Sequence, residues 1–122
     1  MTRKTILAAL GALALTGASL FAEPAKPKSV IHVITIQWKA NATPAAIDAA
    51  IKGVEKMNYK GLTRVWTRPI KMQLPDGYKH IIVMEFESEQ ALKDYADSPA
   101  QKAWYELYQA AREESRTHDI TN

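Results

Sequence analysis

The sequence contains no cysteine among its 122 residues. That absence excludes disulfide bonds and any lipid attached to a cysteine. Histidine is scarce as well: the three residues His32, His80 and His118 lie far apart, and none has a second ligand at helical or strand spacing beside it. We therefore expect no metal site and no cofactor, and a fold that depends on its apolar core alone.

A strong charge imbalance is also missing. The chain has 16 basic and 13 acidic residues, and Arg3 and Lys4 belong to an N-terminal segment that looks like a leader. A nearly neutral domain lacks the concentrated basic face that nucleic acid requires, so we exclude a nucleic-acid partner. Arg64, Arg68 and Lys71 form one basic cluster, which we interpret as charges that protect the edge of a sheet.

No apolar run is long enough to span a bilayer, which takes about 20 residues. The run "TILAALGALALTGA" follows two basic residues and precedes a small residue at Ala22, which is the order of a secretory signal peptide. We predict a leader over 1–22, a flexible tether over 23–29 and one domain over 30–120. Cleavage after Ala18 and a retained anchor are the alternatives. The mature protein should be periplasmic or secreted, with no stable membrane insertion.

Period-two patterns of β-branched and apolar residues predict strands over 30–38, 62–67 and 78–86, with a short last strand around 117–120. In the third strand, Tyr78 is in phase with His80.

Helices are predicted between these strands. Thr43 can cap a helix that starts at Pro44 and ends before Gly61, and Ser88 can cap the next one. Ser98-Pro99 should end that helix and start another. The apolar stripe of the restarted helix is predicted to comprise Ala100, Ala103, Trp104, Leu107 and Ala111.

The order β-α-β-β-α-β predicts an α+β, ferredoxin-like protomer with helices on one face of an antiparallel sheet. The uncovered face would usually be polar, yet both faces of the first and third strands are apolar. A second copy that packs sheet against sheet would cover the apolar residues of the open face, so we predict a homodimer. The predicted interface residues are Ile31, Val33, Ile81 and Val83.

Three stretches resemble the stress-responsive dimeric α/β-barrel (Dabb) family: "HVITIQWK", "GYKHIIVMEFES" and "YADSPAQKAW". The resemblance spans nearly all of residues 30–120 and implies a protomer whose sheet pairs with its twin to form a barrel. One plant member of the family is a cyclase that closes a linear polyketide by an aldol step, without metal or cofactor.

By position, that member's catalytic tyrosine corresponds to Tyr95, and its strand histidines correspond to His32 and His80. Its helical histidine corresponds to Gln101 here. A glutamine amide can orient a carbonyl, but it cannot shuttle the proton that an aldol cyclisation moves. The same reaction by the same route is therefore not expected, and no catalytic residue is assigned.

The leading hypothesis is a homodimer that binds a small, partly apolar molecule between sheet and helices, with His32 and His80 side by side beneath Tyr95. Gln101 and Trp104 complete the predicted ligand contacts, although core packing is the simpler account of Trp104. One alternative is a cofactor-independent enzyme, similar to polyketide cyclases or monooxygenases, that uses Tyr95 and one strand histidine as acid and base. Another is a purely structural stress protein.

Overall fold

The computed structural model describes residues 22–122. The predicted leader lies outside the described residues, except for Ala22. In the described part no helix is long and apolar enough to cross a bilayer. The elements in chain order are β1 (Val30–Trp38), α2 (Pro44–Glu55), β2 (Leu62–Trp66), β3 (His80–Phe86), α3 (Glu89–Tyr95), α4 (Pro99–Ala111) and β4 (Arg112–Ile120).

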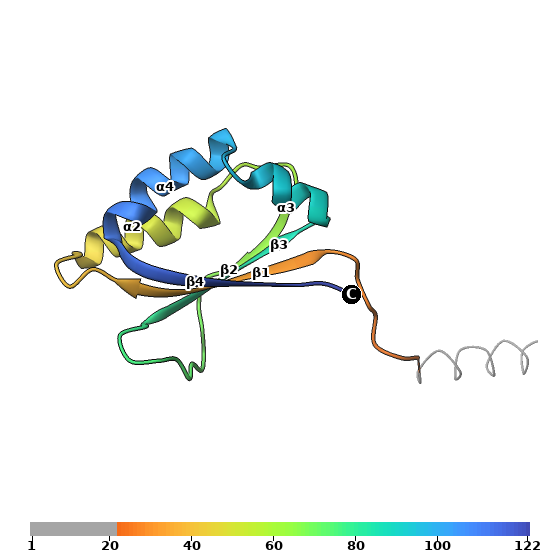
Figure 1. The fold of residues 1–122 in the computed structure, drawn as a ribbon, viewed down its shortest axis with the longest axis horizontal. Helices are drawn as coiled ribbons and strands as arrows, with labels where there is room; N and C mark the ends of the chain where they lie inside the picture. The colour runs from red at the N-terminus through yellow and green to blue at the C-terminus, as the bar shows by residue number, and fades with distance from the viewer. Residues whose placement is uncertain (1–21) are drawn as a thin grey trace, which may run out of the picture.

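The four strands form one antiparallel sheet in the order β2-β3-β1-β4, with all three helices on one face (Figure 1). β2 and β4 are the two edge strands. This is the ferredoxin-like α+β arrangement, and the predicted fold class is confirmed. Of the predicted basic cluster, Arg64 lies on the edge strand β2, whereas Arg68 and Lys71 follow it in the connection to β3.

Side-chain oxygens cap the three helices where the sequence predicted helix starts. The Oγ1 atom of Thr43 accepts a hydrogen bond from Ala46 N (3.1 Å), and Ser88 Oγ accepts one from Ala91 N (3.0 Å). Ser98 Oγ caps α4 at Gln101 N (3.2 Å), with Pro99 as the first helical residue. The predicted break at Ser98-Pro99 is confirmed.

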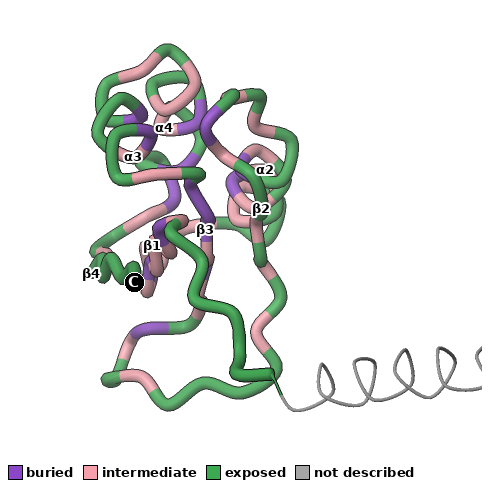
Figure 2. The backbone as a smooth tube through the Cα atoms, turned by 90° about the vertical axis from the view of Figure 1, so that its right-hand side faces the viewer, coloured by how far each residue is buried: buried purple, intermediate pink, exposed green. Residues whose placement is uncertain are grey.

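The core lies between the helices and the helix-facing side of the sheet, where the buried segments of β1 and β3 gather (Figure 2). Burial of this apolar layer is the main favourable contribution to folding. Its fully buried strand residues are Ile36, Ile82, Met84 and Phe86, each 0 % exposed.

The predicted apolar stripe of α4 is partly wrong. Tyr108 is 1 % exposed, whereas Leu107 is 44 % exposed. The buried stripe follows positions 104, 108 and 111, so α4 is rotated by about one residue from the expected orientation. The ring of Tyr108 stacks on Trp104 at a centroid distance of 4.3 Å, which places a phenol where a leucine was predicted.

Two further predictions need correction. The last strand was predicted around 117–120, but β4 begins at Arg112 directly after α4. β4 lies at the edge of the sheet and is mostly exposed, so its residues are charged and polar. Its sequence therefore lacks the apolar alternation by which a strand is predicted. Tyr78 does not share the face of His80, since its ring lies under the guanidinium of Arg116 (Cζ to centroid 5.1 Å), which projects from the opposite face.

The sheet face that points away from the helices carries the predicted interface residues. Ile31, Val33, Ile81 and Val83 are all half-buried there. On the flanking strands, Trp66 is paired with Val83 and is 46 % exposed, and Ile120 is 66 % exposed. We call these six residues the apolar strip.

An ion pair between the exposed Arg64 and the buried Glu85 lies beside the apolar strip. Glu85 is 3 % exposed and accepts hydrogen bonds from the Arg64 guanidinium and from Ser29 Oγ (2.8 Å). The hydrogen bonds from Arg64 and then Ser29 lower the pKa of Glu85 to about 2. Ser29 belongs to the segment before β1, which is also tied to the chain end, because Thr121 Oγ1 donates to the Ser29 carbonyl (2.8 Å).

Candidate functional site

Tyr95 ends α3 and projects into the core. It is 3 % exposed and packs against Phe86 (ring centroids 4.9 Å apart) and Tyr59 (5.6 Å). Its buried hydroxyl has no hydrogen-bond partner. Burial raises the pKa of Tyr95, and the nearby Tyr105 and Tyr108 raise it further, so the phenol stays protonated at neutral pH. Such a group can donate a hydrogen bond, but it is a weak acid.

His32 lies on the helix-facing side of β1, where the register places it opposite Asp119 of β4. Its Nδ1 atom is 2.5 Å from Asp119 Oδ1, and its ring meets Phe86 edge-on at 6.1 Å. An imidazole that donates from Nδ1 to a carboxylate keeps Nε2 free as an acceptor. His32 and Tyr95 therefore both contact the ring of Phe86, which brings this part of the expected site together.

His80 does not join them. The β1–β3 register pairs His32 with Met84 and Ile36 with His80, so the two histidines are four positions apart, about 13 Å along the strands. His80 Nε2 lies 2.9 Å from the carbonyl oxygen of Thr67. The expectation of two histidines side by side beneath Tyr95 is wrong. Both stand near the start of a strand, and antiparallel strands start at opposite ends.

Gln101 holds the junction between α3 and α4. Its Oε1 accepts a hydrogen bond from the backbone N–H of Asp97 (2.7 Å), a residue with a positive φ of 62°. Its Nε2 donates to the Tyr105 hydroxyl (3.4 Å). The amide oxygen thus stabilises a left-handed turn, and the amide nitrogen points toward Tyr105.

Trp104 faces α2. Its Nε1 donates to the carbonyl oxygen of Ala50 (2.8 Å), and it is 4 % exposed. Gly53 permits this close approach, because a Cβ there would lie 3.0 Å from Trp104 Cδ1. Trp104 therefore packs as a core residue between the two helices, with its polar atom satisfied.

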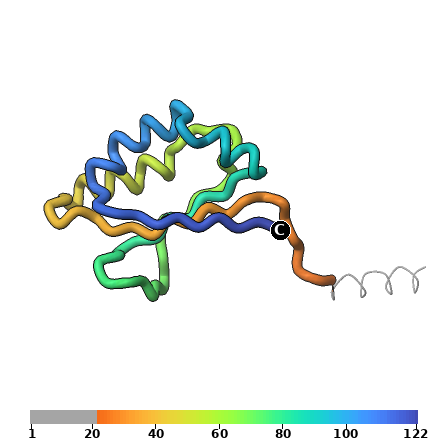
Figure 3. The backbone as a smooth tube through the Cα atoms, in the orientation of Figure 1, coloured from red at the N-terminus to blue at the C-terminus, as the bar shows by residue number. Residues whose placement is uncertain are grey.

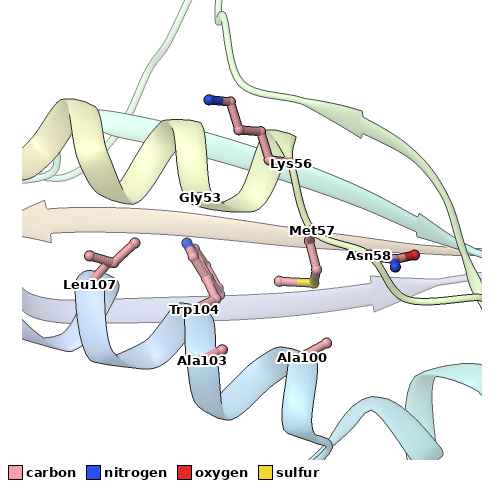
Figure 4. Close-up of a pocket in the computed structure, with 8 residues that line it drawn as sticks. All are labelled: Gly53, Lys56, Met57, Asn58, Ala100, Ala103, Trp104 and Leu107. Atoms are coloured by element: carbon pink, nitrogen blue, oxygen red, sulfur yellow. The ribbon is translucent and has the colours of Figure 1, made fainter.

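Two hollows open on the surface near these residues. One, of about 340 Å³, lies between α2 and α4, and Met57, Trp104 and Leu107 line it (Figure 4). The other, of about 310 Å³, lies between α3 and the strand ends, with Val30, Leu92 and Ile120 as apolar lining and Asp119 as a polar one. Neither is lined by Tyr95 or His80. The second reaches the carboxylate that holds His32.

Sequence reasoning missed Asp119 and Tyr108. Asp119 is 87 residues from His32, so only the register of β4 shows that they meet. The hydroxyl of Tyr108 is buried near Ser115 and Arg112 without a well-formed hydrogen bond to either, and burial raises its pKa. Within residues 22–122 no three His, Asp or Glu side chains gather closely enough to hold a metal ion.

Comparisons with known proteins agree with this architecture. The family model described as "Stress responsive A/B Barrel Domain" matches residues 30–122. No curated protein matches the sequence.

Solved structures share the fold at low identity. A Dabb family protein with a ferredoxin-like fold from Mesorhizobium loti is 19 % identical, with a TM-score of 0.64 over 77 % of this chain and 96 % of that one. A dimeric ferredoxin-like protein from Bacteroides fragilis is 12 % identical (TM-score 0.66; 80 % and 100 % covered). A hydroxynitrile lyase from Passiflora edulis is 16 % identical (TM-score 0.68; 77 % and 93 % covered). At these identities the likeness establishes the fold alone.

Proposed function

The chain belongs to the stress responsive A/B barrel domain family, and from that premise we propose that it is an exported homodimer that binds a small, mostly apolar molecule carrying one carbonyl or hydroxyl group. The observation that carries the ligand part is the Tyr95 hydroxyl, which is buried without a partner. A buried hydroxyl is costly unless it is hydrogen-bonded, so a ligand oxygen is a fitting partner.

The ligand would enter between α3, α4 and the β1–β4 side of the sheet. Tyr95 and His32 both contact Phe86 there, and the hollow that Asp119 lines lies at the same end of the strands. Aromatic rings surround Tyr95, whereas the hollow combines the apolar Val30, Leu92 and Ile120 with polar and charged residues such as Asp119. Apolar walls with a few polar groups are usual in small-molecule sites. Because the pKa of Tyr95 is raised, binding suits this phenol better than proton donation does.

The dimer would form through the apolar strip. Its residues are half-buried or exposed in the protomer, on the face that the helices leave open. Removing such apolar area from water is worth about 25 cal/mol per Å². Solved structures described as dimeric share the fold, which supports a homodimer. Export rests on residues 1–22, and N-terminal sequencing of the protein from its native host would test it.

A matched pair of probes tests the ligand site. Acetophenone and α-methylstyrene have nearly the same shape, but only the ketone has an oxygen that can pair with Tyr95. We expect NMR titration to show both binding to the wild type, and Tyr95→Phe to weaken the ketone alone, by about tenfold for one hydrogen bond. Failure of both probes at millimolar concentration, or equal loss of both in the variant, would contradict the proposal.

A second candidate function is proton transfer at carbon, and the His32–Asp119 contact favours it. Asp119 would hold the Nδ1–H of the ring while Nε2 removes a proton next to a carbonyl. The Tyr95 hydroxyl would donate a hydrogen bond to the resulting enolate oxygen. In D₂O the wild type should then exchange the methyl protons of acetophenone faster than His32→Gln and Asp119→Asn do. Equal exchange rates in all three proteins would refute proton transfer, and only the binding function would stand.

A further inference from the structure

The connection between β2 and β3, residues 67–79, projects from the sheet on the side away from the helices (Figures 1 and 3). We call it the arm. It exposes two large apolar side chains, Ile70 (95 % exposed) and Met72 (39 % exposed). An isoleucine that is almost wholly in water gains nothing within the protomer, so only a surface from outside the protomer can bury it.

Both ends of the arm are anchored. At its start, the carbonyl oxygen of Thr67 meets His80 Nε2 (2.9 Å), and Thr67 Oγ1 donates to Glu55 Oε2 (3.1 Å). At its end, Lys79 N donates to the Ile36 carbonyl (2.9 Å). These bonds hold the root of the arm against the sheet, so its direction is set by the fold.

The second half of the arm packs under the open face of the sheet. Tyr78 is 8 % exposed beneath Arg116. Gly77 has a positive φ of 92° and lies so close to Gln37 that a Cβ at this position would be only 3.0 Å from Gln37 Nε2. Arg116 and Gln37 both project from the open face. In Figure 2 the arm runs below the strands, on the side opposite the helices. The arm is therefore continuous with the surface that carries the apolar strip.

We propose that the arm is a clamp for a second copy of this chain, so that Ile70 and Met72 of each protomer are covered by the partner. The occupant is a second copy because the arm continues the open face: Trp66, 46 % exposed, immediately precedes it and is paired with Val83 of the apolar strip. In a two-fold dimer both arms make the contact, so each dimer has two clamps. The inference rests on the proposed homodimer and adds a surface that the strip alone does not include.

Two exposed apolar residues on opposite sides of the protomer give a matched test. Ile70→Asp changes the arm, and Leu107→Asp changes an exposed leucine on the helix side. We expect sedimentation equilibrium of the mature protein to show a dimer Kd at least tenfold higher for Ile70→Asp, since a charge enters the interface twice, and an unchanged Kd for Leu107→Asp. Circular dichroism should verify that both variants are folded.

The absence of cysteine allows a second readout. Single-cysteine variants Ile70→Cys and Leu107→Cys can each be labelled with an environment-sensitive fluorophore. The label at position 70 should shift to the blue as protein concentration rises through the dimer Kd, and the label at 107 should not. A wild type that stays monomeric would overturn the proposed homodimer. A dimeric wild type with unaltered Ile70→Asp association and no shift at position 70 would overturn the clamp alone.

Discussion

Removing the hydroxyl of Tyr95 should stabilise the protein. The ring lies among Phe86 and Tyr59, and its oxygen has no partner in a position that is 3 % exposed. A buried polar group without a hydrogen bond costs about 1–3 kcal/mol. Phenylalanine keeps the ring contacts and removes that cost, so Tyr95→Phe should raise the free energy of unfolding by about 1 kcal/mol or more, which is about 4–8 °C in Tm for a domain of this size.

Tyr59 provides the matched control with the opposite sign. Its hydroxyl donates to the carbonyl oxygen of Ala91 at 2.8 Å. Tyr59→Phe loses that bond, which should lower the free energy of unfolding by about 1 kcal/mol. Both variants delete one oxygen from aromatic rings that touch each other, so the packing change is nearly equal and the hydrogen bond is what differs.

Urea unfolding of the wild type and both variants measures the effect, at one protomer concentration because a dimer's stability depends on it. The m-values should agree, so that midpoints report stability. The reasoning is refuted if Tyr95→Phe is destabilised as much as Tyr59→Phe, because the Tyr95 hydroxyl would then have a protein partner. Adding acetophenone should reduce the difference in unfolding free energy between Tyr95→Phe and the wild type. The ketone supplies the acceptor that the wild-type hydroxyl lacks, so it stabilises the wild type more.

Three further changes have clear expected outcomes. The pKa of Glu85 is lowered to about 2 from its ordinary value of 4.5, so its ion pair with Arg64 stabilises the fold fully above pH 4.5. That contribution is lost as the pH falls toward 2. The difference in unfolding free energy between the wild type and Glu85→Gln should therefore shrink over this range. Val33→Asp should convert the dimer to a folded monomer in sedimentation, and a stable dimer would count against the sheet-to-sheet interface. Gly61→Ala should lower Tm markedly, because the new Cβ would lie 2.7 Å from the Ala91 Cβ and one of the two backbones must move; an unchanged Tm would mean that this contact yields easily.

Local patterns were sufficient for most of the elements. β1 begins and ends at the predicted residues because its alternation is unbroken and "NATP" ends it with a cap and a proline. Ser98-Pro99 marked the start of α4, since proline loses no hydrogen bond at a first helical position. β4 was predicted too short, because its first residues are charged and no loop separates them from α4.

The candidate site was predicted less well. Tyr95 was singled out through the family resemblance, and its role stays a prediction, whereas His80 was placed in the wrong neighbourhood. The mistake has a geometric cause, since sequence shows which face a strand residue takes but not which partner residue lies opposite. The contact of His32 with Asp119 was missed for the same reason.

The sequence by itself determined the elements, their order and which strand faces are apolar, because turn residues, caps and side-chain periodicity act over a few neighbouring residues. It also determined that both sheet faces carry apolar side chains, on which the expectation of a second copy depends. Only the tertiary structure decided that the Tyr95 hydroxyl has no partner, and which side chains meet in the His32–Asp119 and Glu85–Arg64 pairs. These contacts join residues 21 to 87 positions apart, and their distances depend on strand register and helix rotation, where a shift of one residue changes every partner.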